Sequence, residues 1–245
     1  MITNSATGTN LVEIAPDIYR INTPVAFPDG SGFSFNQYVI VDDAPMIFHT
    51  GMRGLFPVVR EAVEKLFPVA RLRYAALSHF ESDECGALND FLAVAPHALP
   101  VCGTIAAMVS INDFATRPPH VLADGAEIDL GRHRMRWFDT PHVPHAWECG
   151  LMLDTVSRTF FCGDLFTQPG SGERPLTDGD ILGPSEGFRL ALDYYAHAPQ
   201  TETTLERFAR EQPTTLAVMH GSAWRGDGAA LLRSLAASLR ERRAA

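Results

Sequence analysis

The sequence predicts an α/β (α+β) fold in four layers, with two β-sheets packed against each other and helices on both outer faces. Predicted strands and helices occur in two successive sets, and each set begins with strands and ends with helices. No linker is long enough to separate the sets, and 245 residues with 46% hydrophobic content can fill one sizeable core. We therefore expect an αβ/βα sandwich that forms a single domain over residues 1–245.

The first set begins with apolar or alternating runs, separated by Gly and Pro, that are typical of strands. A helix follows, because apolar residues recur at helical spacing from Leu55 to Leu66, and Pro68 ends the pattern. A further apolar run predicts a buried strand, and a second helix closes the set. The predicted strands are 11–21, 35–41, 46–49 and 73–77, and the predicted helices are 55–66 and 87–95.

The second set consists of short strands joined by Gly-containing turns, followed by helices. Thr104 is predicted to cap a helix at the start of this set. Segment 168–184 is rich in Gly, Pro, Ser and Asp, which predicts either a flexible lid or an ordered loop beside a site. The predicted strands are 101–102, 121–122, 127–130, 135–139, 151–153, 159–162 and 215–219, and the predicted helices are 105–111, 185–197, 201–211 and 228–243.

The overall charge argues against two classes of partner. The formal net charge is −9, from 20 basic and 29 acidic residues, whereas nucleic acids and anionic membranes require a basic face. No apolar run is long enough to span a bilayer, and the first ten residues have neither a basic region nor an apolar one typical of a signal peptide. We therefore expect a cytoplasmic protein. The four cysteines form no C-x-x-C pair, which argues against a disulfide framework or a zinc knuckle.

The segment Ser78–Gly86 carries the densest group of metal-binding side chains. His79, Glu81, Asp83 and Glu84 follow a predicted buried strand and precede a predicted helix. Loops at the carboxyl ends of strands are where open α/β folds usually place their sites. Imidazole and carboxylate groups bind divalent first-row metals, so the loop predicts a metal site whose remaining ligands come from elsewhere. The alternative is a polar loop in which an acidic residue complements a helix dipole.

Three further strand-end residues complete a pattern that resembles a known family. His145, Asp164 and His220 follow apolar strands or lie in loops between them. This layout resembles the metallo-β-lactamase superfamily, whose signature is H-x-H-x-D-H followed by a distant His, Asp and His. The first motif here reads H-x-E-x-D-E, and its Glu in place of the second His resembles the flavodiiron branch. The segment H-G-S-A-W-R from His220 and the pair Tyr194-Tyr195 also resemble that branch.

The resemblance implies a metallo-β-lactamase-like sandwich with a pair of iron ions, zinc or manganese being the alternatives. One ion would be held by His79, Glu81 and His145, and the other by Asp83 and His220. Asp164 would bridge them. Flavodiiron proteins continue into a flavodoxin-like domain that binds FMN, but no Gly-rich phosphate loop follows a strand here. We therefore expect no FMN in this chain, and electrons from a separate donor protein.

The sequence also departs from the flavodiiron pattern. Glu84 stands where the pattern has His, and it would either bind the second metal, point away or donate a proton. His49 replaces the Asp that normally supports the site from outside the ligand shell. His145 rather than His142 is the expected ligand, because it lies nineteen residues before Asp164, as in the superfamily. Glu84 and Tyr195 are the candidate catalytic residues, although aromatic core packing is the alternative for Tyr195.

The implied function is that of a non-haem diiron enzyme, an oxidoreductase that binds and reduces dioxygen or nitric oxide. A homodimer would suit electron delivery from a separate donor. The main alternative is a dinuclear hydrolase with zinc or a mixed metal pair, acting on an ester, thioester, lactone or phosphodiester through a metal-activated hydroxide. A third possibility is a binding or sensor module that has lost its chemistry, since a fold does not fix a function.

Overall fold

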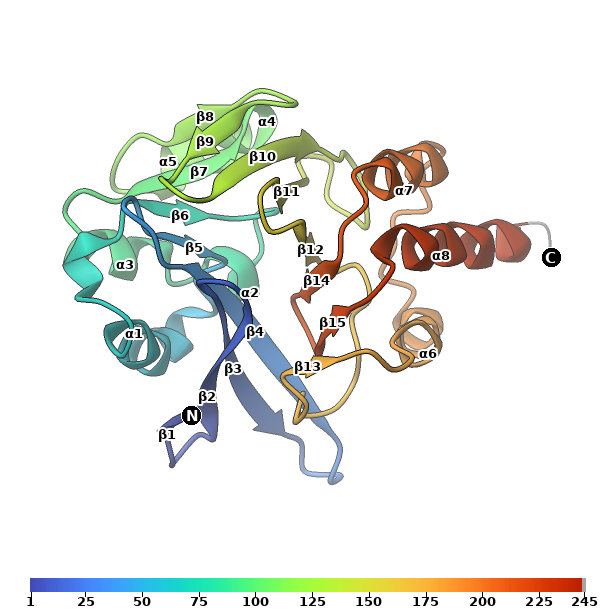
Figure 1. Cartoon of the computed structure of the whole chain (residues 1–245), viewed down its shortest axis with the longest axis horizontal. Helices are drawn as coiled ribbons and strands as arrows, with labels where there is room; N and C mark the ends of the chain where they lie inside the picture. Colours follow the sequence, from blue (N-terminus) through green and yellow to red (C-terminus); the bar gives the residue numbers. More distant parts are fainter. Residues whose placement is uncertain (244–245) are drawn as a thin grey trace.

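The computed structural model describes residues 1–243, which form two β-sheets packed face to face with helices outside them (Figure 1). Residues 244 and 245 of the predicted domain lie outside the described part of the chain. One sheet has eight strands and the other has seven. The predicted four-layer arrangement in a single domain is confirmed. Within residues 1–243, no helix has both the length and the apolar character needed to cross a membrane.

The eight-stranded sheet follows the order of the sequence from β1 to β8. Its first five strands pair antiparallel, and β5 to β8 pair parallel. The predicted strand 11–21 is instead a hairpin of β2 and β3, because the chain turns at Asp17 with φ 56°. The strands are β1 Ile2–Asn4, β2 Thr9–Ala15, β3 Ile18–Ala26, β4 Gly32–Ile40, β5 Met46–Phe48, β6 Tyr74–Ala76, β7 Leu99–Gly103 and β8 His120–Leu122.

The seven-stranded sheet has the order β13-β15-β14-β12-β11-β10-β9. Its centre joins β12 to β14 in parallel, and β12, β11, β10 and β9 form an antiparallel meander. The sequence pattern did not predict β13 or β15, which are too short to show an alternation of their own. The strands are β9 Glu127–Asp129, β10 Arg134–Asp139, β11 Gly150–Asp154, β12 Thr159–Gly163, β13 Leu176–Thr177, β14 Thr215–Val218 and β15 Ala223–Arg225.

Two of the predicted helices differ from those observed. The segment predicted as one helix over 105–111 consists of α4, five residues of π-helix and α5, and Thr104 is its first helical residue rather than its cap. The helix predicted over 185–197 ends earlier, because Asp193 adopts a left-handed conformation at its end. The helices are α1 Phe56–Glu64, α2 Ser82–Cys85, α3 Leu88–Val94, α4 Thr104–Ala106, α5 Asn112–Phe114, α6 Leu182–Leu192, α7 Thr201–Arg210 and α8 Gly228–Arg243.

Three hydrophobic cores separate the four layers. The middle core joins the inner faces of the two sheets and includes Phe48, Trp137 and Phe161. A second core packs α1 and α3 on the eight-stranded sheet, and a third packs α7 and α8 on the other sheet. Burial of apolar side chains on both sides of each sheet therefore fixes the stacking of the layers. It also brings the ends of β6, β12 and β14 together at one edge of the molecule.

Candidate metal centre

The loop after β6 carries His79, whose side chain is fully buried. Glu81 then takes an extended conformation immediately before α2. The short helix carries Asp83 and Glu84 in its first turn. Glu84 is completely buried, whereas Glu81 is half-exposed. The local fold therefore spreads four potential ligands across one edge of the sandwich.

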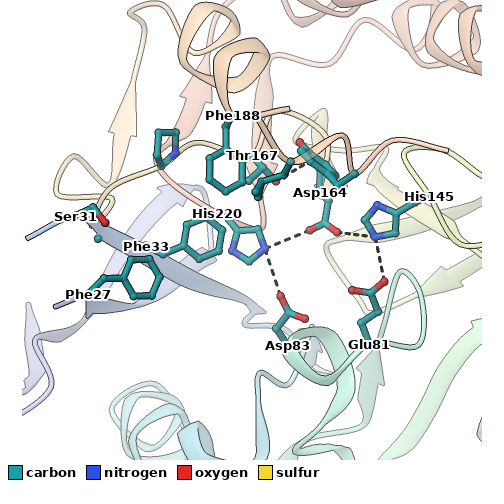
Figure 2. Close-up of a pocket in the computed structure, with 14 residues that line it drawn as sticks. Phe27, Ser31, Phe33, Glu81, Asp83, His145, Asp164, Thr167, Phe188 and His220 are labelled. Atoms are coloured by element: carbon teal, nitrogen blue, oxygen red, sulfur yellow. Dashed lines mark hydrogen bonds and ion pairs between the residues drawn. The ribbon is translucent and has the colours of Figure 1, made fainter. Parts of the chain in front are cut away.

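One group of ligand atoms gathers around His79 and His145 (Figure 2). The Nε2 atoms of the two imidazoles lie 3.0 Å apart. Glu81 Oε1 lies 3.5 Å from His79 Nε2 and 3.3 Å from His145 Nε2. Asp164 Oδ2 lies 3.6 Å from His79 Nε2 and 3.2 Å from His145 Nε2. Four side chains from three loops therefore converge on one point.

These separations match the space that a first-row metal ion requires. Bonds of about 2.1 Å from one ion place neighbouring ligand atoms about 3.0 Å apart in an octahedron and about 3.4 Å apart in a tetrahedron. The two imidazole Nε2 atoms lie 3.0 Å apart, and one oxygen each of Glu81 and Asp164 lies within 3.6 Å of both. The group thus has the geometry of a metal site for one ion.

A second group of ligand atoms forms around His220, on the other side of Asp164. His220 Nε2 lies 3.4 Å from Asp83 Oδ2 and 3.4 Å from Asp164 Oδ1. Potential ligand atoms of Asp83, Glu84 and His220 all lie within 4.8 Å of one another. Asp164 therefore presents Oδ2 to the first group and Oδ1 to the second, which is the orientation that a carboxylate bridging two ions would have.

Polar atoms on the buried side of the centre, those of Glu84 above all, lack hydrogen-bond partners among the described residues. Both carboxylate oxygens of Glu84 are buried without a hydrogen-bond partner among the described residues, and so is Asp164 Oδ1. Glu84 Oε2 lies 3.9 Å from His79 Nε2. An unsatisfied buried carboxylate is costly, and cations bound on this side would satisfy these oxygens. The residues present thus fit a pair of metal ions.

Burial and the neighbouring charges shift the pKa values of the imidazoles in opposite directions. Burial lowers the pKa of His145 and His220, but the neighbouring carboxylates, Asp164 first among them, outweigh it and raise each pKa to about 9. Hydrogen bonds from His145 and His79 lower the pKa of Glu81 to about 2. Burial and the charge of Asp164 raise the pKa of Glu84 well above its usual value. In the absence of metal, protons on the imidazoles balance the carboxylates, so metal binding would displace protons.

Comparison with known proteins identifies the family. The model of the ODP family of beta lactamases matches residues 33–211. This range includes six of the seven candidate ligands and ends before His220. The chain belongs to the ODP family. A metallo-β-lactamase-like fold and the resemblance to the flavodiiron branch are both confirmed by this match and by the relatives described next.

Curated relatives of this ODP-family chain carry flavoprotein names. The anaerobic nitric oxide reductase flavorubredoxin of Salmonella arizonae is 27% identical over 209 residues, which cover 80% of this chain and 42% of the relative. The putative diflavin flavoprotein A 2 of Synechocystis is 24% identical over 199 residues, covering 78% of this chain and 33% of the relative. The chain thus spans less than half the length of these relatives.

Solved structures confirm the fold. The metal-soaked Flv1 flavodiiron core from Synechocystis has a TM-score of 0.84 at 22% identity, covering 96% of this chain and 62% of that one. The rubredoxin:oxygen oxidoreductase of Desulfovibrio gigas has a TM-score of 0.81 at 17% identity, covering 94% of this chain and 61% of that one. At these identities the likeness concerns the arrangement of the chain alone.

A hydrogen-bond chain behind the candidate centre orients His79. Ser78 Oγ lies 2.9 Å from His79 Nδ1 and 2.9 Å from His49 Nε2. His49 Nδ1 in turn lies 2.9 Å from Met219 Sδ. Burial lowers the pKa of His49 to about 3, so its imidazole is neutral. With His79 Nε2 facing the ligands, His79 Nδ1–H donates to Ser78, and the Ser78 hydroxyl donates to His49.

We predict that Ser78→Ala lowers the affinity of the first site for metal roughly 10–100-fold, as loss of an outer hydrogen-bond partner commonly does. The variant removes the acceptor for His79 Nδ1–H, so that imidazole loses its fixed orientation. Competition with a chelator measures the change. Ser234→Ala, an exposed position on α8, is the matched control. Equal affinities for Ser78→Ala and the control would show that the hydrogen-bond chain does not support the site.

His220 is held by residues of the other sheet. His220 Nδ1 donates to the Ser34 carbonyl oxygen at 2.8 Å, which leaves Nε2 free to face Asp83 and Asp164. The next carbonyl, that of Gly221, accepts from Arg20 Nη2 at 2.7 Å and from Asn36 Nδ2 at 2.9 Å. No motif in the sequence predicts these supporting contacts. A buried Arg within an apolar strand, such as Arg20, was the available signal.

His142 lies outside the centre. Its side chain is exposed, and it belongs to none of the groups of potential ligands within the described residues. We predict that His142→Ala retains the full metal content of the wild type, measured by elemental analysis of the purified protein. The matched variant His145→Ala is expected to lose one ion. Loss of an ion from His142→Ala instead would reverse the choice between these two histidines.

The structure does not bring Tyr195 into the candidate centre. Its side chain is buried in the core beneath α7 and α8, and it does not line the cavity above the ligands. Tyr194 lies there instead, and its hydroxyl donates to the Asp164 carbonyl oxygen at 3.2 Å. The catalytic role predicted for Tyr195 therefore has no support from its position, and Tyr194 is the tyrosine that contacts the site.

Proposed function

We propose that the chain is a non-haem diiron protein that binds dioxygen or nitric oxide and reduces it with electrons from a donor outside these 245 residues. The observation that carries the proposal is the orientation of Asp164, whose two carboxylate oxygens face two different groups of ligands. Side chains that project inward around a carboxylate-rich pair of irons recur in diiron proteins. This geometry supports a dinuclear rather than a mononuclear centre.

The types of ligand support iron or manganese. Imidazoles and carboxylates converge here, whereas thiolates would favour zinc or an iron–sulfur cluster. The thiols of Cys85, Cys149 and Cys162 donate to the carbonyl oxygens of Glu81, Val143 and Phe160, and Cys149 also lies beside His79. Burial also raises the pKa of Cys85 to about 12, which keeps it protonated. A thiolate ligand is therefore not part of the proposal.

Bound iron would supply open coordination positions and electrons to a diatomic substrate. In the proposal the first ion would be held by His79, Glu81 and His145, the second by Asp83, Glu84 and His220, and Asp164 would serve both. The chain orients these groups through the contacts of Ser78 with His79 and of Ser34 with His220. Burial of His79 and Glu84 keeps water from one side of the centre, so a substrate would approach from the other side.

The names of relatives support both substrates. One relative is a nitric oxide reductase flavorubredoxin, and one structural neighbour is a rubredoxin:oxygen oxidoreductase. We extend the proposal to a cytoplasmic location and to a homodimer that accepts electrons from a separate protein. Neither nucleic acid nor membrane is proposed as a partner, given the net charge of −9.

Metal analysis of protein purified without oxygen tests the proposal. We expect about two irons per chain and a new near-ultraviolet charge-transfer band after exposure to air or nitric oxide. His79→Ala, which removes a ligand of the first ion, is expected to lose the band. Two zinc ions per chain, with a spectrum that air leaves unchanged, would contradict the proposal. That result would favour the hydrolase alternative and call for ester, thioester, lactone and phosphodiester assays.

A further inference from the structure

Two positions at the candidate centre differ from the flavodiiron pattern in opposite directions of charge. The pattern has Asp at position 49 and His at position 84, whereas this chain has His49 and Glu84. The two positions together therefore carry one carboxylate in either case. In this chain the carboxylate has moved from outside the ligand shell to a place among the candidate ligands. The exchange makes the contacts of both residues worth comparing.

His49 lies behind both groups of candidate ligands. Its side chain is buried, with Nε2 at 2.9 Å from Ser78 Oγ and Nδ1 at 2.9 Å from Met219 Sδ. Ser78 and Met219 each come directly before a candidate ligand histidine in the chain. The charges of Asp164 and Asp83 also act on the His49 imidazole. A charge at position 49 would therefore act on both halves of the centre.

His49 and Glu84 approach the same imidazole from its two sides. Ser78, which contacts His49, lies 2.9 Å from His79 Nδ1, and Glu84 Oε2 lies 3.9 Å from His79 Nε2. The main chain joins the two positions as well, because the Thr50 N–H donates to the Glu84 carbonyl oxygen at 2.7 Å. Burial lowers the pKa of His49 to about 3, so its ring is neutral. The carboxyl group of Glu84 thus has an uncharged residue behind it.

A count of formal charges shows what this combination achieves. When all are ionised, the four candidate carboxylate ligands supply as much negative charge as two divalent ions supply positive charge. A further carboxylate at position 49 would leave one negative charge in excess, and a neutral residue at both positions would leave one positive charge in excess. Uncompensated charge is costly in a buried site. The four carboxylates are those of Glu81, Asp83, Glu84 and Asp164.

We propose that His49 and Glu84 form a compensating pair, in which the neutral imidazole at position 49 permits a buried carboxylate at position 84 to bind the second ion. The inference rests on the proposed function, because it takes two divalent ions as the charge to be balanced. It makes His49 a positioning residue that acts on metal binding without contacting the metal. Either residue changed alone would leave the centre with an excess of charge.

A double-mutant cycle tests the pair. Absorption titration measures the affinity for the second cobalt(II) ion in the wild type, His49→Asp, Glu84→His and the double variant. Glu84→His alone is expected to lower this affinity, because it leaves one positive charge in excess. In the His49→Asp background the same change is expected to lower the affinity by a factor at least about ten times smaller. Equal factors in the two backgrounds would overturn the inference.

His49→Asn is the matched control, because it has the shape of His49→Asp without the charge. His49 adopts φ 64°, and Asn, Asp and His are the residues other than glycine found most often in this left-handed region. Both substitutions therefore suit the backbone. In the His49→Asn background, Glu84→His is expected to lower the affinity as much as it does in the wild type. If His49→Asn relieves the loss as well as His49→Asp does, the charge is not the cause and the inference fails.

Thermal unfolding of the metal-free proteins in a strong chelator gives a second readout. His49→Asp is expected to unfold at a lower temperature than the wild type, because it adds a buried carboxylate near others. Adding Glu84→His to this variant is expected to recover part of the loss. If His49→Asp does not fold but the double variant does, the pair is supported. If neither folds, or if the two changes are additive, the residues do not compensate each other.

The result is separable from a failure of the proposed function. Cobalt titration and unfolding in chelator require neither iron nor a reaction with air. If the changes are coupled as expected, but the purified protein contains zinc and air leaves its spectrum unchanged, the diiron proposal fails while the pair remains. If the protein contains iron that responds to air, but the changes are additive, the inference alone fails.

Discussion

Asp164→Ala is expected to release both metal ions from the chain. Asp164 contacts both groups of ligands, with Oδ2 at 3.2 Å from His145 Nε2 and Oδ1 at 3.4 Å from His220 Nε2. Its removal takes one ligand from each site, and it also removes one of the negative charges that would compensate the two cations. The affinity of each site should fall by more than the roughly 10–100-fold that follows loss of an outer hydrogen-bond partner.

Elemental analysis after dialysis against a weak chelator measures this effect. Asp129→Ala is the matched control, because Asp129 lies on β9 with a side chain that is 64% exposed and belongs to none of the groups of potential ligands among the described residues. The control is expected to retain both ions. A full complement of metal in Asp164→Ala would contradict the bridging role, and loss of a single ion would place Asp164 in one site only. Circular dichroism of both variants verifies that the fold is retained.

Most candidate ligands could be predicted from the sequence because they lie at or just after the end of a strand, whereas His145 lies within the loop between β10 and β11. The H-x-E-x-D-E segment follows β6, Asp164 follows β12 directly, and His220 comes two residues after β14. The structure brings all of them together at one edge, as predicted. Their role as ligands stays a prediction. What the spacing could not show is that Asp164 presents one oxygen to each group, since this depends on the side-chain orientation.

The supporting contacts could not be predicted, because they join segments far apart in the chain. Ser34 and His220 are separated by 186 positions, and Arg20 and Gly221 by 201. Both contacts form only after the two sheets pack together. The sequence pattern predicts one strand where β2 and β3 form a hairpin, because the turn between them spans only two residues within an otherwise apolar or alternating run. The alternation of apolar and polar residues predicts that a segment forms a strand, but it does not reveal a two-residue turn within that segment.

Glu84 is the position at which the sequence departs from the flavodiiron pattern and the structure shows a buried carboxyl group. The family pattern has His at this position, whereas here a carboxylate with no exposed surface lies between the two groups of ligands. Neither of its oxygens has a hydrogen-bond partner within the described residues. A carboxylate is retained in such a place at a considerable cost in free energy unless a cation compensates it. We therefore expect Glu84 to be a ligand of the second ion.

Glu84→Gln is expected to weaken the second site by more than about tenfold while the first site keeps its ion. The amide has the same size as the carboxyl group, so the buried space stays filled and the free energy of unfolding of the metal-free protein should change by about 1 kcal/mol or less. Metal titration measures the first effect, and thermal unfolding in the presence of a strong chelator measures the second.

Two further variants separate a ligand role from a role in packing. Glu64→Gln, an exposed position in α1, is the control for the chemical change and should bind two ions. Glu84→His restores the residue of the family pattern and tests whether an imidazole can replace the carboxylate. If Glu84→Gln binds two ions with unchanged affinity and an unchanged spectrum, Glu84 is not a ligand. If it instead loses both ions and its stability, the side chain acts through packing around His79, 3.9 Å away.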